Sequence, residues 1–330
     1  MPFFGHGTPC PYTMSLLALI AALLLEQFHP LASRKHLYGW LSGYVGFFRR
    51  NFNAGEHRHG KIAWLLAVLP LLSGAAVLFW TLYLMHPALA WAFNVLVLYL
   101  TMGFRQFSHY FTDIHQALRD GRLDEARGLL SDWRGESAHE LNAEEVARLA
   151  IEQALLASHR NVFGVIVWFV LFSALGLGGA AGALLYRIGQ FLHARWGDED
   201  EAELGEFPGS KFGGFARQAF HTLEWLPVRL TTATFAIVGD FEDTVYCWRT
   251  QAAGWPDPEQ GILLAGGAGA LGVRLGMPIP QGGMPLDRPE LGVGDDADAD
   301  FMQSTIGLVW RAVVFWLILL LLLTLASLIG

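Results

Sequence analysis

Long apolar runs without formal charges alternate with polar connections along the chain. Four runs contain no Lys, Arg, Asp or Glu: Ile62–Met85, Ala88–Phe104, Asn161–Tyr186 and Ala312–Ile329. A helix needs about 20 apolar residues to cross the hydrocarbon core of a bilayer, so each run predicts a membrane-crossing helix. The dipeptide His86-Pro87 separates the first two runs and predicts a very tight turn between them.

Two shorter apolar segments, Ser15–Leu25 and Leu230–Val238, are less decisive. The first could span the bilayer if it continues to Phe28, or it could lie in the interface. The second follows Pro227 and indicates a re-entrant or interfacial segment. We therefore expect an all-α integral membrane protein with four strong transmembrane helices, one or two short or re-entrant segments, and helical and Gly-rich soluble connections. Residues 1–330 are predicted to form a single membrane domain.

Basic residues indicate the side of the membrane on which each connection lies. Residues 29–60 and 105–160 are rich in Arg, which is typical of cytoplasmic loops, and the periodicity of 105–160 predicts a helical connection. The run 161–186 leaves two alternatives. If it is one straight helix, residues 187–305 are periplasmic, and their acidic composition favours this alternative. If the glycines at 176–179 break it into a helical hairpin, residues 187–305 stay cytoplasmic.

The composition agrees with a membrane protein and excludes several soluble classes. Of 330 residues, 53% are hydrophobic and 16% are charged, whereas a typical soluble domain has about 25% charged residues. The net charge of −8 argues against a general nucleic-acid-binding protein, and two Cys exclude a disulfide framework. The Gly- and Pro-containing connection 187–305 holds 18 Asp and Glu against eight Lys and Arg. Within it, Asp198–Glu206 is predicted to be a solvated loop.

A glycine pattern at Gly267–Gly272 has the spacing of a dinucleotide-binding motif. That chemistry requires a strand before the glycines and a helix after them, so that a pyrophosphate meets the helix N-terminus. The preceding segment, Gly261–Ala265, predicts at best a weak strand. A packing loop of small residues is therefore the favoured interpretation.

Polar residues near the membrane runs are candidates for a ligand site. Glu152 and Arg160 precede the run 161–186, and an acid beside a membrane helix is a functional hypothesis by default. Further along the chain, Trp225 suits a membrane interface, and Arg229 beyond the proline could meet an anionic ligand or a lipid phosphate. An interfacial anchor explains these residues equally well.

Five motifs are informative in combination: Glu145–Glu152, Gly182–Arg187, Trp225–Leu230 (Trp-Leu-Pro-Val-Arg-Leu), Gly254–Pro256 (Gly-Trp-Pro) and Gly269–Gly276 (Gly-Ala-Leu-Gly-Val-Arg-Leu-Gly). With them the chain resembles the CobD/CbiB family, which includes the AmpE branch, over about residues 15–325. The resemblance implies a membrane protein. The family's enzymes are adenosylcobinamide-phosphate synthases, which join an aminopropanol phosphate to a corrinoid carboxylate with ATP and Mg²⁺.

The chain departs from the synthases where the resemblance implies catalytic polar groups. Those positions hold Leu156, Ala157, Arg160, Phe220, His221 and Ala252. The family has an Asp at the position of Arg160, and an arginine there would repel Mg²⁺. The segment Ala154–Arg160 is similar to the AmpE branch, whose members are described as modulators of the cell-wall response.

We therefore expect a non-enzymatic, AmpE-like sensor or signalling modulator in the bacterial inner membrane, with several passes, no catalytic residue, no metal and no cofactor. The expected partners are the lipid bilayer and an anionic small molecule or protein, not nucleic acid, and an oligomer is compatible with the sequence. The candidate ligand-binding residues are Glu152, His159, Arg160, His221, Glu224, Arg229, Trp255 and Arg274. The alternative is a divergent adenosylcobinamide-phosphate synthase of cobalamin biosynthesis, an amide-forming ligase that would use ATP and Mg²⁺.

Overall fold

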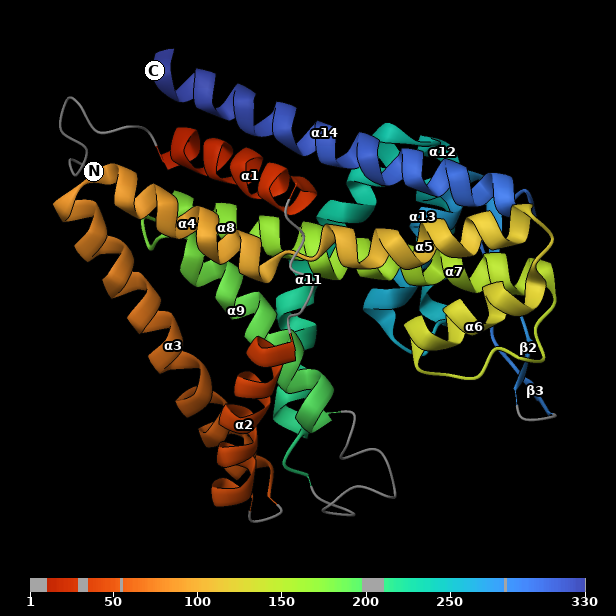
Figure 1. Ribbon diagram of the computed structural model, residues 1–330, viewed down its shortest axis with the longest axis horizontal. Helices are drawn as coiled ribbons and strands as arrows, with labels where there is room; N and C mark the ends of the chain where they lie inside the picture. Colours follow the sequence, from red (N-terminus) through yellow and green to blue (C-terminus); the bar gives the residue numbers. More distant parts are fainter. Residues whose placement is uncertain (1–10, 29–34, 54–55, 198–210, 282–283, 330) are drawn as a thin grey trace. The chain divides into compact units, whose positions relative to one another are not determined.

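The computed structural model describes residues 11–28, 35–53, 56–197, 211–281 and 284–329 of the chain (Figure 1). The predicted solvated loop at 198–206 lies outside these residues. The fold comprises two compact units, described separately below. The first consists of residues 1–102, 164–225 and 320–330, and the second of residues 103–163 and 226–319.

The first unit is built from helices. They are α1 (Pro11–Phe28), α2 (Lys35–Phe52), α3 (His57–Met85), α4 (Pro87–Thr101), α8 (Gly164–Ala174), α9 (Gly179–Leu192), a π-helical turn η2 (His193–Gly197), and the first half of α11 (Gly214–Val238). Between α3 and α4, the His86 side chain caps the new helix by accepting a hydrogen bond from the Ala88 amide at 3.1 Å. Pro87 occupies the first turn of α4, where a missing N–H costs nothing. The tight turn predicted from His86-Pro87 is confirmed.

The run 161–186 is not one straight helix, so the favoured alternative of the sequence analysis is wrong. Helix α8 ends at Ala174, and α9 begins at Gly179 and packs back against it (Figure 1). Gly176 and Gly178 have φ angles of +74° and +82° in the intervening turn, a backbone region that favours glycine. These glycines therefore end the first helix and allow the chain to reverse.

Small residues let the two helices of this hairpin approach closely. A Cβ on Gly164 would lie 2.2 Å from the ring of Tyr186, and one on Gly182 would lie 2.1 Å from the carbonyl oxygen of Trp168. Both distances are far below van der Waals contact, so any larger residue would push the helices apart.

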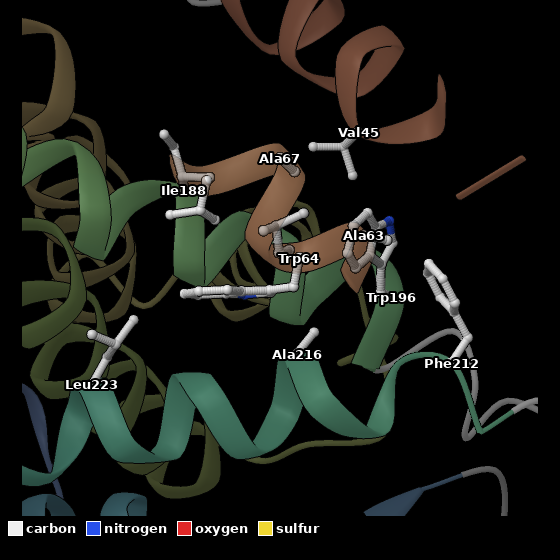
Figure 2. Close-up of a cluster of buried hydrophobic side chains, with 11 residues drawn as sticks. Val45, Ala63, Trp64, Ala67, Ile188, Trp196, Phe212, Ala216 and Leu223 are labelled. Atoms are coloured by element: carbon white, nitrogen blue, oxygen red, sulfur yellow. The ribbon is translucent and has the colours of Figure 1, made fainter. Parts of the chain in front are cut away.

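A buried cluster joins α2, α3, α9, η2 and α11 (Figure 2). Trp64 of α3 lies beside Ala216 and Leu223 of α11, while Trp196 and Phe212 pack with ring centroids 5.0 Å apart. Gly60 permits this packing, because a Cβ there would lie 1.9 Å from the Phe212 carbonyl oxygen.

Helix α11 continues through Pro227, and a neighbouring side chain compensates for the missing hydrogen bond. Proline has no N–H to donate to the carbonyl four residues earlier, which is that of Leu223. The Trp168 indole nitrogen donates to this carbonyl at 3.1 Å instead. Residues 230–238 form the last part of this 25-residue helix rather than a separate short segment.

The second unit combines helices with short strands. Its helices are α5 (Phe104–Arg119), α6 (Leu123–Arg134), α7 (Ala143–Ser158), the π-helical turn η1 (His159–Phe163), the second half of α11, α12 (Phe241–Thr250), the 3-10 turn η3 (Ala252–Gly254), α13 (Pro258–Leu271) and α14 (Ala299–Ile329). Helices α5, α6 and α7 pack on one another, which confirms the helical connection predicted over 105–160.

The strands follow α13 and are β1 (Val273–Gly276), β2 (Ile279–Gln281), β3 (Met284–Leu286), β4 (Glu290–Leu291) and β5 (Asp295–Asp296). Strand β1 is central, antiparallel to β4 and parallel to β5, and β2 pairs with β3 in an antiparallel hairpin. These strands are too short for the periodicity of the sequence to predict them.

The glycine pattern Gly267–Gly272 does not form a loop after a strand; Gly267–Leu271 belong to buried helix α13 and Gly272 caps it. The glycines of this segment allow close packing, as we expected, but they lie on a helix and not in a loop. A Cβ would lie 2.2 Å from Thr232 at Gly266, 2.7 Å from Leu155 at Gly267 and 2.5 Å from the Asp243 carbonyl oxygen at Gly269. Three neighbouring helices can therefore approach the backbone of α13.

Three helical segments of the described chain are long and apolar enough to cross a membrane: His57–Met85, Ala143–Ala174 and Ala299–Ser327. An all-α membrane protein is therefore supported, but the predicted count of four strong spans is not. The run 161–186 is broken into a hairpin, and α4 has only 15 residues, or about 22 Å of helix. Helices α1 and α4 are the shorter apolar helices.

Candidate functional site

A buried carboxylate organises the second unit where α7 meets strand β1. Helix α7 begins with a capping box, in which Asn142 and Glu145 exchange hydrogen bonds at 2.9 and 2.7 Å. Glu152 lies two and a half turns further on and is 6% exposed. One of its oxygens accepts the Gly276 amide at 2.9 Å, and the other accepts a short hydrogen bond from Arg288.

Arg288 connects this carboxylate to an aromatic side chain. Its guanidinium lies 5.0 Å from the ring centroid of Trp255, while the side chain is 11% exposed. A guanidinium between an aromatic face and a carboxylate is held by cation–π attraction and a charge-assisted hydrogen bond together. The three residues come from α7, from the loop after η3, and from the loop before β4.

The backbone at the end of β1 is constrained to fit this arrangement. Gly276 has φ of +70°, and a Cβ there would lie 2.0 Å from the Pro289 carbonyl oxygen. The next residue, Met277, has φ of +64°, and its amide donates to the same carbonyl at 3.2 Å. Such backbone geometry is costly for a residue with a side chain and is found at functional sites.

Arg148 lies one helical turn before Glu152 and is buried, with 4% exposure. It donates to the Met277 sulfur at 2.9 Å, and the Glu144 carboxylate is 3.8 Å away. Arg274 on β1 pairs with Asp296 at 2.5 Å and with Glu290 at 3.7 Å. Three arginines, Arg148, Arg274 and Arg288, therefore surround or flank the same short strand. Such a site is suited to holding anions such as phosphates or carboxylates.

Of the residues predicted from sequence, Glu152, Trp255 and Arg274 belong to this site. His159 is buried elsewhere in the second unit, with its Nδ1 3.0 Å from the Thr231 hydroxyl. Glu224 belongs to the first unit, is buried, and accepts a hydrogen bond from the Tyr186 hydroxyl at 3.3 Å.

Three further candidates, in addition to His159 and Glu224, lie outside the group around β1. Arg160 and Arg229 belong to the second unit, and His221 belongs to the first, where its ring lies 6.0 Å from that of His193. The eight candidates are divided between the two units. A cavity that all eight share therefore remains a prediction.

Sequence reasoning missed Arg148, Arg288 and Met277. The available signal was the spacing of Arg148 and Glu152, four residues apart on a predicted helix, which places them on one face. Arg288 and Met277 carried no such signal, because long-range contacts of a Gly- and Pro-containing segment have no periodicity.

Comparisons with known proteins agree on one family. The family described as CobD/Cbib protein matches residues 16–309. The chain is 35% identical to a protein of Stutzerimonas stutzeri named "Cobalamin biosynthesis protein CobD", over 92% of this chain and 96% of the relative. A protein of the same name from Chromobacterium violaceum is 34% identical over 77% and 72% of the two chains.

A more distant relative, "Cobalamin biosynthesis protein CbiB" of Salmonella typhimurium, is 28% identical over 71% of this chain and 72% of its own. None of the solved structures matches significantly. The matched range of 16–309 contains both compact units apart from their terminal residues, including the whole site around Glu152. The chain belongs to the CobD/CbiB family.

Proposed function

We propose that the chain is an enzyme of cobalamin biosynthesis that forms an amide between a corrinoid carboxylate and an aminopropanol phosphate, using ATP. The observation that carries the proposal is the 35% identity, along almost the whole of both chains, to a protein named for cobalamin biosynthesis. The reaction itself is what the resemblance to the CobD/CbiB synthases implies.

The proposed chemistry has two bond exchanges. A carboxylate oxygen attacks the terminal phosphorus atom of ATP, and the P–O bond to ADP breaks, which gives a mixed anhydride of the carboxylate and phosphate. The amine then attacks the acyl carbon, the C–O bond to the phosphoryl group breaks and releases phosphate, and the amine loses one proton as the amide forms. Every reactant and leaving group is an anion or carries one, so cationic side chains are needed to bring them together.

The arginines around β1 supply such cations. Arg148 is buried, the Arg288 side chain is 11% exposed, and Arg274 is partly exposed. Guanidinium groups pair with phosphate and carboxylate oxygens in a planar, two-pronged geometry, and they stay charged at any physiological pH. We assign Arg148 and Arg288 a role in binding and orienting the anionic substrates, while Arg274 already pairs with Asp296 and Glu290.

Mg²⁺ would neutralise phosphate charge if it accompanies ATP. In the proteins that bind it, one or two carboxylates usually join the phosphates as ligands. Glu152 does not fit this role, because its two oxygens already accept hydrogen bonds from Gly276 and Arg288. We therefore assign no step of the reaction to a metal at Glu152 and treat this carboxylate as a structural partner of Arg288.

A non-enzymatic, AmpE-like modulator is the second candidate. It is favoured by apolar or cationic residues where the resemblance to synthases implies acids, as at Leu156, Phe220 and Arg160. The names of the relatives favour the enzyme instead. Under either function, we propose a multi-pass protein of the bacterial inner membrane whose partners are lipids and an anionic molecule.

A complementation experiment separates the two candidates. The chain is expressed in a bacterium that lacks its own cobinamide-phosphate synthase and depends on cobalamin for growth. Growth and cobalamin production support the enzyme. Absence of both, with normal amounts of folded protein in the membrane, contradicts the enzyme and leaves the modulator.

A further inference from the structure

Arg148 is a buried cation that pairs with Glu144 only at 3.8 Å and donates no hydrogen bond to an oxygen in the described part of the chain. Its Nε has no hydrogen-bond partner among the residues that the structure describes. Its Nη1 donates only to the thioether sulfur of Met277, which is a weak acceptor, and the distance of 3.8 Å to Glu144 is too long for a hydrogen bond. Burying a charged group is costly unless it is paired and hydrogen-bonded, so the long ion pair and the unused Nε leave the Arg148 guanidinium only partly satisfied.

Met277 occupies the position where a strong acceptor is expected. Its side chain caps Arg148, while its backbone has φ of +64°, a region that residues with a Cβ rarely adopt. The flexible thioether side chain can change rotamer at little cost. A ligand that displaces the sulfur would therefore gain a charged hydrogen bond and lose only a weak one.

A second guanidinium, that of Arg288, is linked to Gly276 through Glu152. Arg288 donates one Nη to Glu152, whose other oxygen accepts the Gly276 amide. The remaining Nη of Arg288 is buried and has no partner within the described part of the chain. Glu152 and Glu144 balance the charges of the two arginines, but the Nε of Arg148 and one Nη of Arg288 remain as buried donors that a ligand could use.

From this geometry we propose that Arg148 and Arg288 form a phosphate-binding subsite that Met277 covers when no ligand is bound. The inference rests on the proposed function, since it assigns the phosphate of the amino-alcohol phosphate to this subsite. Arg274 is excluded from it because Asp296 and Glu290 already pair with that residue. A phosphate offers oxygens in several directions and can accept from both guanidinium groups at once.

The test measures phosphate binding to the purified full chain in detergent. Inorganic phosphate and O-phosphoethanolamine are titrated by calorimetry, with chloride at matched ionic strength as the blank. Wild-type protein should bind both in a saturable manner. Met277→Gly should tighten binding about threefold to tenfold, because the variant removes the covering sulfur and relaxes the backbone.

Arg148→Gln should weaken phosphate binding at least about tenfold, which is the usual worth of a charged hydrogen bond. Arg122→Gln is the matched control, because Arg122 is a surface cation paired with Asp120 and Glu125. It should leave binding unchanged. Equal binding by Arg148→Gln and the control, or no saturable binding by wild type, would overturn the inference.

The test of the phosphate-binding subsite does not depend on a single variant. If Arg148→Gln does not fold, Met277→Gly decides, because unchanged or weaker binding contradicts a covering role for the sulfur. Amide formation is assayed separately. Phosphate binding without amide formation would overturn the proposed function alone, and amide formation without Arg148-dependent binding would overturn the subsite alone.

Discussion

Neutralising the buried ion pair between Glu152 and Arg288 should destabilise the second unit strongly. Their side chains are only 8% and 11% exposed, so solvent screens little of the interaction. Glu152→Gln keeps an acceptor for the Gly276 amide but leaves a buried, uncompensated guanidinium. We expect the free energy of unfolding to fall by about 3 kcal/mol. This is at the lower end of the cost of breaking a buried pair, because Trp255 still contacts Arg288.

The double variant tests whether the loss belongs to the pair. Arg288→Met should also cost about 3 kcal/mol, because it leaves the Glu152 carboxylate with one hydrogen bond. Glu152→Gln combined with Arg288→Met should cost clearly less than the sum of the two, with a coupling of about 2 kcal/mol. Glu125→Gln is the surface control, since Glu125 and Arg122 are about half exposed, and it should leave the unfolding midpoint unchanged.

A buried thiol provides the assay. Cys247 is fully buried, and burial raises its pKa to about 11, so the folded thiol reacts slowly at neutral pH. In a Cys10→Ser background, a thiol-reactive dye should therefore respond mainly to unfolding on heating. Glu152→Gln should lower the midpoint by about 5 °C. Additive effects of the two single variants, or a midpoint equal to that of the surface control, would refute the argument.

Three further predictions concern packing, pH and topology. Gly164→Ala should destabilise the protein by about 1–3 kcal/mol in the same assay, because its Cβ would lie 2.2 Å from the Tyr186 ring; an unchanged midpoint would contradict the close packing of α8 on α9. The unfolding midpoint should fall as pH rises from 9 toward 11. The reason is that the Cys247 thiol has its ordinary pKa of 9.0 in the unfolded chain and therefore loses its proton there before it does in the folded protein. Cys247→Ala should flatten this part of the pH profile. Cysteines introduced at Asp120 and Glu242 should be labelled from the same side of vesicles, since we propose that the α8–α9 hairpin enters the bilayer and returns; labelling from opposite sides would contradict this proposal.

Local patterns in the sequence predicted the structure best. The apolar run 62–85 lies within α3, the run 312–329 lies within α14, and the connection 105–160 is helical in α5, α6 and α7. Each depends on the length of an apolar stretch or on the periodicity of neighbouring residues. Local signals of this kind survive folding because nothing distant overrides them.

The sequence allowed a hairpin at 176–178 as one alternative but could not distinguish it from a straight helix. Gly176 and Gly178 permit a reversal, yet glycines are also common in straight membrane helices. The decisive factor is tertiary, because the α8 and α9 backbones pack at Gly164 and Gly182. The acidic composition of residues 187–305 favoured the straight helix, which is wrong. The tendency of Lys and Arg to mark cytoplasmic loops weakens for loops as long as this one.

Helix α13 was missed for a related reason. Glycine is unfavourable in a helix interior, by about 1 kcal/mol per residue relative to alanine. Burial against α7, α11 and α12 offsets this cost, and such packing is not visible in one segment alone. The same limit hid Arg288, whose partners Glu152 and Trp255 lie 136 and 33 positions away in the chain.

Amide formation by the purified protein is the most direct test of the central proposal. The full chain in detergent is supplied with a corrinoid carboxylate, aminopropanol phosphate, ATP and Mg²⁺, and the products are followed by mass spectrometry. We predict an amide-linked corrinoid phosphate that depends on all three substrates, with the ATP consumed in equal amount. Folded protein that binds phosphate but forms no amide would contradict the proposed function.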